Sequence, residues 1–539
     1  MTFVITQNCC KDASCVPVCP VDCIRPAGGA GESTDTEMLY IDPATCIDCG
    51  ACAEECPVDA IYYEEDLPAK LERFRDINAR YFEHAPLTMD LPSRDGGHAA
   101  VGHGSLRVAI VGAGPSGCYA ANALARVGGV EIALFERLPT PFGLVRAGVA
   151  PDHQHTKAVV EVFDPALTSR TLRCHLNVAI GQDLTHEELL EHHHAVIYAV
   201  GASLSREIGI TGEHLPGSHA AADFVGWYNG HPDHAHHVFD LSAERAVIIG
   251  NGNVALDVAR VLLTGPEELR QTDIAEHALD SLANSMIREV QIIARRGPRE
   301  AAFSVGEFLA LGHLPGVDIV IDGDGLESLP DDDVETAMKL EIAREFAHRP
   351  RQPENKRIIF RFRTSPLEVA GDDHARGLHV RHPGGETETI PARLILRSVG
   401  YRGAPIDGLA FDSGNGVVPN DNGRVLNDDG LPVPGVYVTG WIKRGSRGVI
   451  GTNRSCAEES VTKLWEDFDA GLLNREIGDQ AALDSLLAKR VCDPVDWQGW
   501  CAIDAAERQR GQHADRPRVK FVDLADMLSA ATVRTVSST

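Results

Sequence analysis

The sequence predicts an α/β protein with two parallel-sheet units, preceded by a small α+β domain that is rich in cysteine. Two glycine-rich turns, at residues 112–117 and 250–255, each join an apolar strand to a helix-forming segment, and they predict the α/β part. The small domain is predicted by the cysteines, because nine of the 14 fall within residues 9–56. With 539 residues, the chain is long enough for about three or four domains of ordinary size.

Composition and charge exclude several classes of function. The formal net charge of −28 argues against nucleic acid or an anionic membrane as a partner. No apolar run approaches the roughly 18–20 residues that span a bilayer. The N-terminus has no basic segment followed by an apolar core, so we expect no signal peptide and a cytoplasmic location. Clustered cysteines in such a protein are expected to bind metal rather than to form disulfides.

The strongest motif is Cys46-x2-Cys49-x2-Cys52-x3-Cys56-Pro57, a spacing typical of bacterial ferredoxins. Three thiolates at this spacing surround one iron–sulfur cluster, and the fourth, before the proline, belongs to a second cluster. A zinc ribbon also uses paired cysteines, but it needs neither the third evenly spaced cysteine nor the Cys-Pro ending. We therefore expect two iron–sulfur clusters.

A degenerate copy of this motif lies upstream, at Cys9, Cys15 and Cys19-Pro20, with Asp12 where a further cysteine would stand. Crossed ligation then predicts two ligand sets. These are Cys19, Cys46, Cys49 and Cys52 for a [4Fe–4S] cluster, and Cys9, Cys15 and Cys56 for the other cluster.

The second cluster leaves alternatives open. Three thiolates suit a [3Fe–4S] cluster, whereas a carboxylate from Asp12 could instead complete a second [4Fe–4S] cluster. Cys10 is the alternative to Cys9, although it breaks the register. Cys23 belongs to neither set and is expected to be a buried thiol or one adjacent to a cluster. Residues 1–65 as a whole resemble a seven-iron bacterial ferredoxin.

The first glycine-rich turn follows a strand expected at 106–111. Gly112, Gly114 and Gly117 form a G-x-G-x-x-G pattern before a helix-like segment, and the next strand ends at Glu136. Such glycines permit a tight turn and a close approach of the backbone to a pyrophosphate, whose charge the helix N-terminus stabilises. An acidic residue about 20 positions on accepts hydrogen bonds from a ribose. This unit is predicted to bind a dinucleotide.

The second glycine-rich turn contains Gly250 and Gly252, with Ala255 in the third position, which the motif tolerates. The next strand, expected at 290–294, ends in Arg295 and Arg296 rather than in an acid. Two guanidinium groups suit a 2′-phosphate, so this unit is expected to prefer NADP(H) over NAD(H).

Two such units in one chain are typical of flavoproteins that bind FAD in the first unit and a nicotinamide dinucleotide in the second. The predicted fold is therefore an α/β two-dinucleotide-binding (Rossmann-like) flavoprotein with an N-terminal α+β bacterial ferredoxin domain. We expect an iron–sulfur domain at 1–65, a strap and linker at 66–104, an FAD domain in two parts at 105–205 and 401–470, an NADP domain at 206–400, and a tail of no assigned role at 471–539.

Three segments, 141–153, 250–260 and 441–453, resemble adrenodoxin-reductase-type ferredoxin–NADP reductases, and the resemblance covers residues 106–465. With the iron–sulfur domain included, the chain is similar to bacterial members of this family that carry a fused ferredoxin. The last FAD strand ends in Gly440-Trp441 instead of Gly-Asp, which fits this branch. Disulfide reductases are disfavoured, because no C-x2-C or C-x4-C pair follows residue 56.

The resemblance implies the cofactor-binding residues. FAD is expected to contact Ala113, Glu136, Leu144, Val178, Trp441, Gly448, Val449 and Ile450. NADP is expected to contact Asn251, Gly252, Asn253, Val254, Arg295, Arg296, Glu307 and Gly448. His153 is expected near the isoalloxazine and, with Glu307, is a candidate catalytic residue; whether His153 transfers a proton or only hydrogen-bonds to a neighbouring carbonyl stays open. The other histidines, including those at 192–194, are expected on the surface or in loops, and the five later cysteines as buried thiols.

The predicted function is electron transfer between NADPH and ferredoxin, or another external one-electron redox protein, through FAD and the chain's own clusters. One alternative is the electron-input subunit of a larger NADPH-dependent flavin and iron–sulfur synthase. Another, from a different class, is a redox-sensing or scaffold protein whose clusters regulate binding without turnover.

Overall fold

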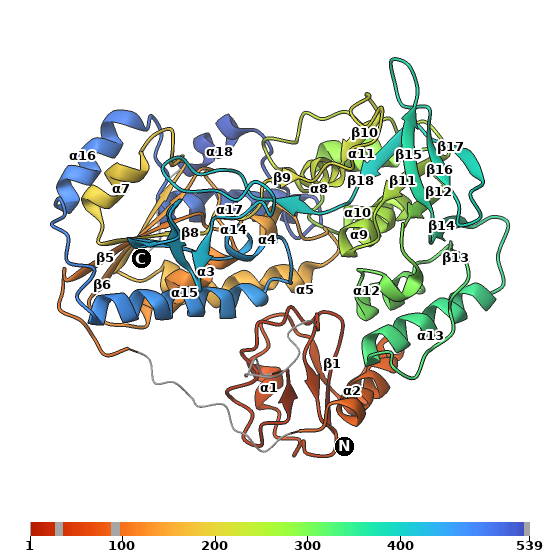
Figure 1. Cartoon of the computed structure of the whole chain (residues 1–539), viewed down its shortest axis with the longest axis horizontal. Coiled ribbons are helices and arrows are strands. Elements are labelled where there is room, and N and C mark those ends of the chain that lie inside the picture. Colours follow the sequence, from red (N-terminus) through yellow and green to blue (C-terminus); the bar gives the residue numbers. More distant parts are fainter. Residues whose placement is uncertain (1, 27–35, 88–97, 533–539) are drawn as a thin grey trace.

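The computed structural model describes residues 2–26, 36–87 and 98–532. Figure 1 shows two large α/β halves with a small N-terminal unit beneath them. Residues 88–97, which include Gly96 and Gly97 of the predicted linker, lie outside the described residues. Among the described helices, none combines the length and the apolar character that a membrane span needs.

The N-terminal unit combines short antiparallel strands with helices. β1 (Phe3–Ile5) pairs with β4 (Ile61–Tyr63), and β2 (Ile24–Arg25) pairs with β3 (Tyr40–Ile41). After the short α1 (Ala51–Glu54), two 3-10 turns, η1 (Glu64–Asp66) and η2 (Ala69–Leu71), lead to α2 (Arg73–His84). Buried Asn78 on α2 donates to the Ile5 carbonyl (2.8 Å) and accepts from the Ile41 N–H (2.9 Å). Part of the predicted strap is therefore a helix, α2, which hydrogen-bonds to two of the strands that precede it.

The first α/β half is built on a seven-stranded sheet, in the order β20-β21-β22-β8-β5-β6-β7. Its strands are β5 (Leu106–Val111), β6 (Val130–Glu136), β7 (Leu172–Leu176), β8 (Ala195–Tyr198), β20 (Asn420–Asp421), β21 (Arg424–Leu426) and β22 (Pro432–Val438). β22, β8, β5, β6 and β7 are parallel. These central strands are apolar runs because helices and loops cover both faces.

Helices and short turns surround this sheet. Residues 115–167 form α3 (Pro115–Ala125), α4 (Leu144–Ala147), α5 (Gln154–Lys157), η3 (Ala158–Phe163) and α6 (Asp164–Leu167). Later segments form α7 (His186–His192), α14 (Trp441–Arg444) and α15 (Thr452–Asp469). The long α15 packs against α3, the helix that follows the first glycine-rich turn.

The second α/β half is built on six parallel strands, in the order β10-β18-β11-β12-β14-β13. These are β10 (Ser218–Ala220), β11 (Arg245–Ile249), β12 (Glu289–Ile293), β13 (Val317–Asp322), β14 (Lys356–Arg361) and β18 (Leu394–Arg397). The surrounding elements are α8 (Ala221–Asn229), α9 (Asn253–Leu263), α10 (Pro266–Arg270), α11 (Glu276–Ala283), η4 (Pro298–Glu300), α12 (Val305–Leu311) and α13 (Val334–His348). A separate antiparallel sheet contains β15 (Ser365–Ala370), β16 (Gly377–Arg381) and β17 (Thr387–Pro391).

The chain crosses between the halves twice, and the two crossings lie side by side. β9 (Leu204–Ser205) pairs antiparallel with β19 (Tyr401–Arg402). The segment between the two crossings forms the second half, so the second half is inserted into the first.

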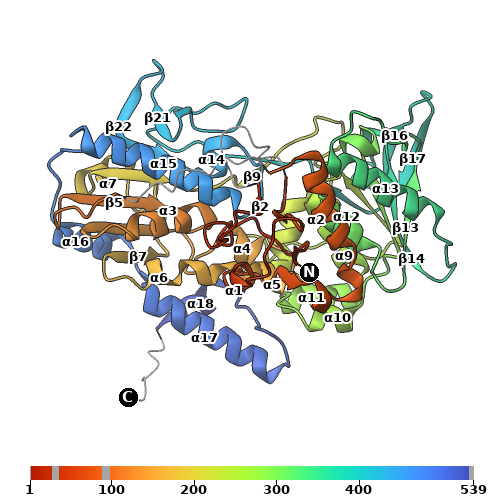
Figure 2. The ribbon, with the colours of Figure 1, turned by 90° about the horizontal axis from the view of Figure 1, so that it is seen from below.

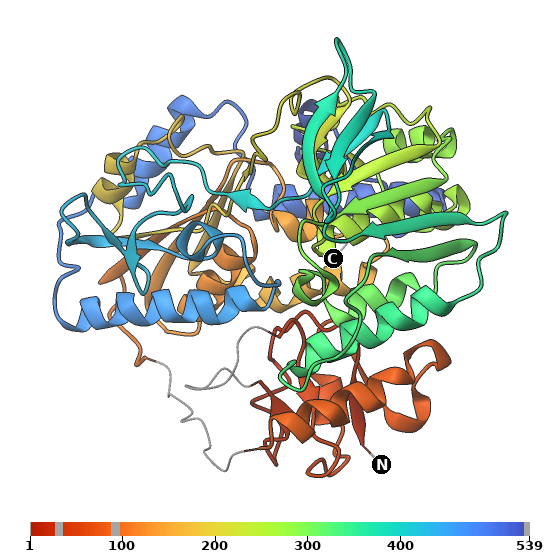
Figure 3. The same cartoon turned by 45° about the vertical axis from the view of Figure 1, so that its right-hand side comes forward.

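The N-terminal unit docks against both halves. Figure 3 shows it below α13 and close to α15. Ion pairs join α2 to α13, from Arg73 to Glu345 (2.7 Å) and from Arg80 to Glu341 (2.7 Å). The contacts with the first half lie at the cysteine sites and are described below.

The C-terminal segment, for which the sequence suggested no role, spans both halves. It forms α16 (Gln480–Arg490), α17 (Trp497–His513) and α18 (Leu524–Ala531), and Figure 2 shows α17 and α18 along one side of the molecule. Buried Glu507 binds Arg146 of the first half through both oxygens (2.5 and 2.9 Å). Buried Lys520 pairs with Asp273 of the second half (2.9 Å). The C-terminal segment thus contacts both halves.

Two expectations about single residues are wrong. Cys118, Cys174 and Cys456 are buried as expected, but Cys492 and Cys501 are exposed. Cys501 lies on α17, which turns Trp500 and Ile503 into the core and leaves Cys501 outside.

His192, His193 and His194 are buried rather than on the surface, although His193 and His194 do lie in the expected loop position, between α7 and β8. They connect α7 to the central strand β8, so the chain enters the core at this point. His193 hydrogen-bonds to the Leu189 carbonyl (2.8 Å), and His194 accepts the Arg107 N–H (2.9 Å).

Candidate functional site

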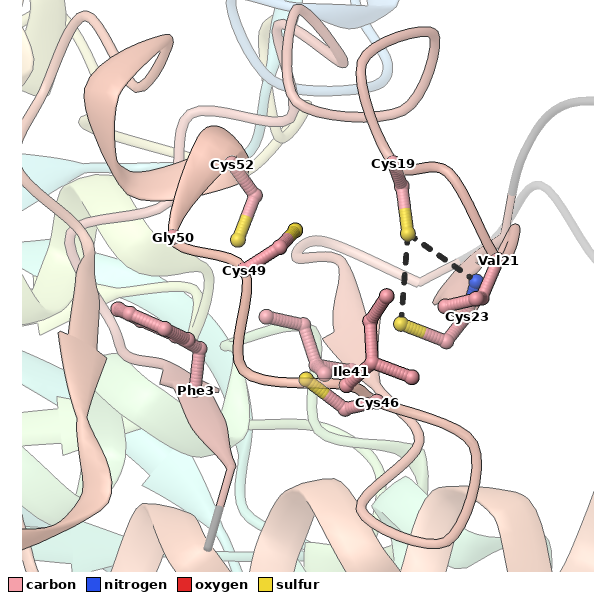
Figure 4. Close-up of a pocket in the computed structure, with 10 residues that line it drawn as sticks. Phe3, Cys19, Val21, Cys23, Ile41, Cys46, Cys49, Gly50 and Cys52 are labelled. Carbon is pink, nitrogen blue, oxygen red and sulfur yellow. Dashed lines mark hydrogen bonds between the residues drawn. The ribbon is translucent and has the colours of Figure 1, made fainter.

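A cavity in the N-terminal unit gathers one of the two predicted ligand sets. Its walls include Cys19, Cys46, Cys49 and Cys52, and Figure 4 shows the four thiols around one space. Gly50 lies in the left-handed region (φ 77°) and starts α1, which positions Cys52. Four thiols around one cavity fit the donor set of a [4Fe–4S] cluster. Cys49 and Ile47 (58% exposed) lie at the surface, so this site opens to solvent.

Cys23 also lines this cavity, and it is buried as predicted. Its Sγ lies 3.4 Å from Cys19 Sγ, and its backbone N–H donates to the same sulfur (3.4 Å). The thiol hydrogen bond from Cys23 lowers the pKa of Cys19 to about 5. Cys23 therefore supports a predicted ligand.

The second predicted set, Cys9, Cys15 and Cys56, lies where the N-terminal unit meets the first half. Cys9 and Cys56 pack against the hydrophobic core of that half, to which Cys10 also belongs. Burial raises the pKa of Cys9 to about 11, and the charge of Cys56 adds to this effect. Burial, and then the charges of Cys9 and Cys56, raise the pKa of Cys15. The three thiols thus lie within electrostatic reach of one another.

The surroundings of Cys9 favour it over Cys10 as a ligand. Cys9 Sγ accepts the backbone N–H groups of Lys11 (3.4 Å) and Leu39 (3.5 Å), and hydrogen bonds to sulfur are a recurrent feature of iron–sulfur sites. Cys10 instead joins the core of the first half, and its carbonyl oxygen accepts the N–H of Gly451 (2.8 Å).

Asp12, on the same loop, is 3% exposed and is held by the protein through both carboxylate oxygens. Oδ2 accepts the Tyr119 hydroxyl (2.6 Å). Oδ1 accepts the backbone N–H of Ser14 (3.1 Å) and also its hydroxyl. Arg454 donates to the Asp12 carbonyl (2.9 Å) and lies 3.8 Å from Oδ1. Tyr119 and Arg454 belong to α3 and α15, so Asp12 joins the N-terminal unit to the first half.

The first glycine-rich turn has the geometry of a dinucleotide site. Gly112 has φ 103°, and a Cβ there would lie 2.6 Å from the Ala199 carbonyl oxygen. A Cβ on Gly117 would overlap the Gly112 carbonyl oxygen. A Cβ on Gly114 would meet nothing within 4 Å, so the turn is open where a pyrophosphate needs close approach.

Glu136 ends β6 beside this turn. Its Oε2 accepts the Ala113 N–H (2.9 Å), and its Oε1 accepts the Leu138 N–H (3.1 Å). A pocket next to Glu136 is also lined by Gly143 and His231. Burial raises the pKa of Glu136, while the backbone hydrogen bonds oppose this shift. The carboxylate is therefore fixed by the backbone at the wall of a pocket, as a ribose ligand requires.

The other predicted FAD residues are distributed around the same half. Val178 is buried and donates its N–H to the Glu136 carbonyl (2.9 Å), whereas Leu144 is 44% exposed at the start of α4. Trp441 starts α14 and stacks on Tyr401, with ring centroids 5.6 Å apart. Gly448, Val449 and Ile450 lie in the loop between α14 and α15.

The second glycine-rich turn repeats this arrangement between β11 and α9. Gly250 has φ 114°, and a Cβ there would overlap the Ser398 carbonyl oxygen. Gly252 is open and caps α9, next to Asn251, Asn253 and Val254. Asn253 accepts the Ser304 N–H (2.8 Å) and donates to Glu37 Oε2 of the N-terminal unit (2.7 Å). The sequence did not reveal that Glu37 reaches this turn.

Arg295 and Arg296 directly follow Ala294 beyond the end of β12, and both are exposed. Within the described ranges 2–26, 36–87 and 98–532, neither guanidinium forms a hydrogen bond or an ion pair with the protein. Their donors are therefore available to a phosphate group, which a guanidinium binds through two parallel hydrogen bonds.

The structure brings the two predicted catalytic residues together around Arg260, which sequence reasoning did not single out. The guanidinium donates from Nη2 to His153 Nε2 (2.8 Å) and from Nη1 to Glu307 Oε2 (3.2 Å). It also donates to Asp257 (2.6 Å) and to Asp152 (2.6 Å). Since His153 Nε2 accepts a hydrogen bond, its proton is assigned to Nδ1. The sequence signal that could have pointed to Arg260 is Asp257-x-x-Arg260, an i, i+3 pair of opposite charges on α9.

Comparisons with known proteins match both parts of the chain. Residues 106–297 match the family model "Pyridine nucleotide-disulphide oxidoreductase", and residues 39–62 match "4Fe-4S binding domain". A "Probable ferredoxin/ferredoxin--NADP reductase" of Mycobacterium tuberculosis is 47% identical over 99% of this chain and 95% of its own length. The "NADPH:adrenodoxin oxidoreductase, mitochondrial" of Arabidopsis thaliana is 39% identical over 79% of this chain and 95% of its own length.

A solved structure shows the same relationship. "Mycobacterium tuberculosis FprA in complex with NADPH" is 42% identical and superimposes with a TM-score of 0.75, over 79% of this chain and 99% of that chain.

Proposed function

Because the chain belongs to the ferredoxin–NADP reductases in which a ferredoxin domain precedes an adrenodoxin-reductase-like unit, we propose that it carries electrons from NADPH through its own iron–sulfur sites to an external protein. The predicted family, fold class and enzyme class are confirmed.

The proposed route depends on one contact between the first half and the N-terminal unit. The Gly451 N–H donates to the Cys10 carbonyl oxygen (2.8 Å), and a Cβ on Gly451 would overlap the Lys11 carbonyl. Gly451 directly follows the loop 448–450 that is predicted to contact FAD. Cys10 directly follows the predicted ligand Cys9. The predicted flavin loop and the three-cysteine site therefore meet at one tightly packed point.

The four-cysteine site differs from the three-cysteine site in its exposure. It opens to solvent at Cys49, whereas Cys9 and Cys56 pack against the core of the first half. This arrangement supports the order NADPH site, flavin site, three-cysteine site, four-cysteine site and surface. Electron transfer falls steeply with distance, so the buried site is the inner one and the exposed site serves the external partner.

When bound, FAD supplies the exchange between a two-electron hydride donor and one-electron acceptors. The chain holds it with the turn at 112–117 and Glu136, and holds NADPH with the turn at 250–255. Arg295 and Arg296 bind the 2′-phosphate. Arg260 orients His153 and Glu307 beside each other, so that a neutral imidazole presents its Nε2 lone pair toward the guanidinium.

For the three-cysteine site we propose a [3Fe–4S] cluster rather than a second [4Fe–4S] cluster. Both carboxylate oxygens of Asp12 already accept hydrogen bonds from Tyr119 and Ser14. A fourth iron bound at Oδ2 would compete with the Tyr119 hydroxyl, and one bound at Oδ1 would compete with Ser14, so ligation by Asp12 would disturb contacts that hold it in the fold. Three thiolates from Cys9, Cys15 and Cys56 match the smaller cluster.

The partner is proposed to be a ferredoxin or another one-electron redox protein with a basic surface. Exposed Asp48, Glu54 and Glu55 lie around the exposed end of the four-cysteine site. Complementary charge would speed association and orient the partner toward this end. A cytoplasmic location remains part of the proposal, because reduced cysteines suit that compartment.

The alternatives make different predictions. A synthase input subunit would require a large partner subunit for turnover, whereas the chain matches 95% of the length of a relative named as a reductase. A sensor or scaffold would not turn over NADPH.

Anaerobic stopped-flow spectroscopy of the full-length holoprotein tests the proposal. After mixing with NADPH, we expect flavin bleaching followed by cluster bleaching, and steady reduction of an added ferredoxin or cytochrome. Flavin bleaching without cluster reduction would reject the internal route. Turnover only with an added subunit would favour the synthase, and no turnover would favour the sensor.

A substitution at Gly451 tests the contact between Gly451 and Cys10. Gly451→Ala is expected to slow cluster reduction at least 10-fold and to leave flavin reduction by NADPH intact, because the methyl group would force the units apart. Gly265→Ala is the matched control, since a Cβ there meets nothing within 4 Å. Equal cluster reduction in both variants would refute the role of this contact.

A further inference from the structure

We propose that Asp223, His234 and His237, on the second half, form a binding site for a borderline divalent transition-metal cation such as Zn²⁺. One ligand atom from each of the three residues lies within 4.8 Å of the others. Asp223 is in the first turn of α8, and the two histidines lie in the loop that follows this helix. The site is separate from the cysteine sites and from both glycine-rich turns.

His234 is the central residue of this site. Its Nδ1 is buried and has no hydrogen-bond partner among the described residues, although it lies 3.5 Å from Asp223 Oδ1. A buried ring nitrogen without a partner is costly. A cation between the nitrogen and the carboxylate would satisfy both atoms. Tetrahedral ligation at about 2.0–2.1 Å separates two ligand atoms by about 3.3 Å, close to the observed spacing.

The backbone holds both histidines in place. A Cβ on Gly226 would overlap the His234 ring, so this ring packs directly on the backbone of α8. The His237 N–H donates to the His234 carbonyl (3.1 Å), and this turn brings the two rings to a centroid distance of 5.5 Å. His237 lies nearly parallel to Phe239, at 6.0 Å. Pre-positioned ligands lower the cost of ordering them on binding.

The chemistry of the donor set suits such a cation. Imidazole nitrogen and carboxylate oxygen are both common ligands of Zn²⁺. Two imidazole nitrogens and one carboxylate oxygen leave a fourth position for water, an arrangement that Zn²⁺ commonly accepts. Mg²⁺ and Ca²⁺ prefer oxygen ligands and are expected to bind poorly.

Two other groups of potential metal ligands among the described residues have no buried ligand atom without a hydrogen-bond partner. His153, Asp257 and Glu307 surround the Arg260 guanidinium, which already occupies their centre. Glu213 of the group Glu207, Glu213 and His214 accepts the N–H groups of Ile208 and Gly209 (2.9 and 3.0 Å). Of the three groups found among the described residues, only the one at Asp223 keeps a buried ligand atom without a hydrogen-bond partner.

The cation would tie the loop after α8 to the first turn of that helix. The same loop carries Asp233, which pairs with Arg137 (2.7 Å), and His231, which lines the pocket beside Glu136. Metal binding is therefore expected to stabilise the contact between the two halves at that pocket.

Isothermal titration calorimetry with ZnCl₂ on the oxidised, full-length holoprotein tests the site, with the visible absorbance of the clusters recorded in parallel. We expect one tight equivalent in the wild type. His237→Ala is expected to weaken it at least about 100-fold, since even partners behind the ligands contribute 10–100-fold. Asp223→Asn, which preserves shape, is expected to weaken it about 10-fold or more. His236→Ala is the matched control, from the same loop but outside the site, and should bind as the wild type does.

X-ray absorption at the zinc edge of the protein with one equivalent bound provides a second readout. Nitrogen and oxygen scattering with two imidazole ligands is expected. Sulfur scattering would show that zinc binds the cysteines and would overturn the proposal. The absence of a stoichiometric site, or an unchanged isotherm in His237→Ala and Asp223→Asn, would overturn it as well.

Discussion

The Tyr119 hydroxyl donates a 2.6 Å hydrogen bond to Asp12 Oδ2, across the interface between the first α/β half and the N-terminal unit. The two residues are 107 positions apart in the sequence. Both are buried, and Asp12 raises the pKa of Tyr119 further after burial itself. The hydroxyl is therefore protonated and acts as a donor at any physiological pH. This bond fixes the loop that carries the predicted ligands Cys9 and Cys15.

Tyr119→Phe is expected to weaken this interface without disturbing the flavin site. Loss of the donor leaves a buried carboxylate oxygen with one partner fewer, at a cost of about 1–3 kcal/mol. Stopped-flow traces should show unchanged flavin reduction by NADPH and slower cluster reduction. Tyr437→Phe is the matched control, because Tyr437 donates an equally short bond to Asp467 (2.6 Å) within the first half. Equal cluster reduction in the two variants would argue against Tyr119 as an interface contact.

Substitution of the two adjacent cysteines distinguishes their roles. Cys9→Ser is expected to remove the three-cysteine cluster, so that the iron content falls by about three atoms per chain. Cys10→Ser is expected to keep it, because the contact of Cys10 with the first half is made by its backbone carbonyl. Iron and sulfide analysis with low-temperature EPR measures both.

Asp12→Asn completes this test. The amide keeps an oxygen that accepts from Tyr119, so a [3Fe–4S] signal should persist in this variant. Conversion of a four-iron into a three-iron signal on substitution would show that Asp12 is a ligand and that our assignment is wrong.

Local patterns in the sequence predicted the turns and the cysteine sets, because their geometry depends on neighbouring residues. Gly112 and Gly250 are needed where the backbone passes a carbonyl group at close range, and the motif spacing itself encodes this requirement. Likewise, the spacing of Cys46, Cys49 and Cys52 around Gly50 places three thiols on one loop. These roles could be inferred without knowing the rest of the fold.

The contacts between units could not be predicted in this way, because each joins segments that are far apart in the sequence. Glu37 meets Asn253 over a separation of 216 residues, and Arg146 meets Glu507 over 361. In the sequence, Asp12 stands where a cysteine ligand is expected. Its hydrogen bond from Tyr119 depends on the packing of α3 against the N-terminal unit. The ion pair between Lys520 and Asp273 (2.9 Å) likewise joins segments that are far apart in the sequence.

The nucleotide preference depends on Arg295 and Arg296. Replacing both with alanine is expected to raise the KM for NADPH about 10–100-fold and to change that for NADH less than about 2-fold. The reason is that a hydrogen bond to a charged group contributes about 1.5–3 kcal/mol, and only NADPH carries the 2′-phosphate. Steady-state kinetics with both nucleotides measure the ratio.

Arg299→Ala is the control for this pair, because Arg299 is close in sequence but donates to the Glu327 carbonyl (2.8 Å). A similar loss of affinity for both nucleotides in the double variant would reject a phosphate-binding role.

Glu37 is expected to oppose nucleotide binding, because its carboxylate bonds to Asn253 at the turn predicted to hold the NADP diphosphate. Burial raises its pKa, although the hydrogen bond from Asn253 opposes this shift. A raised pKa in the folded state means that the protonated carboxyl contributes to the stability of the fold at low pH, and that this contribution is lost as pH rises through the folded pKa. In its ionised form, the Glu37 carboxylate faces the position expected for the diphosphate charge.

Glu37→Gln is accordingly expected to lower the Kd for NADP⁺ about 5-fold at neutral pH, since two charges about 4 Å apart in water repel by about 1 kcal/mol. In the wild type, affinity should rise as pH falls toward the pKa of Glu37, and this dependence should flatten in the variant. Glu335→Gln is the matched control, because Glu335 is another half-buried carboxylate with a raised pKa, hydrogen-bonded to Tyr40 (2.9 Å). Flavin difference spectra measure the Kd. Weaker binding in Glu37→Gln would instead show that the carboxylate positions Asn253 for the nucleotide, and the proposed repulsion would be refuted.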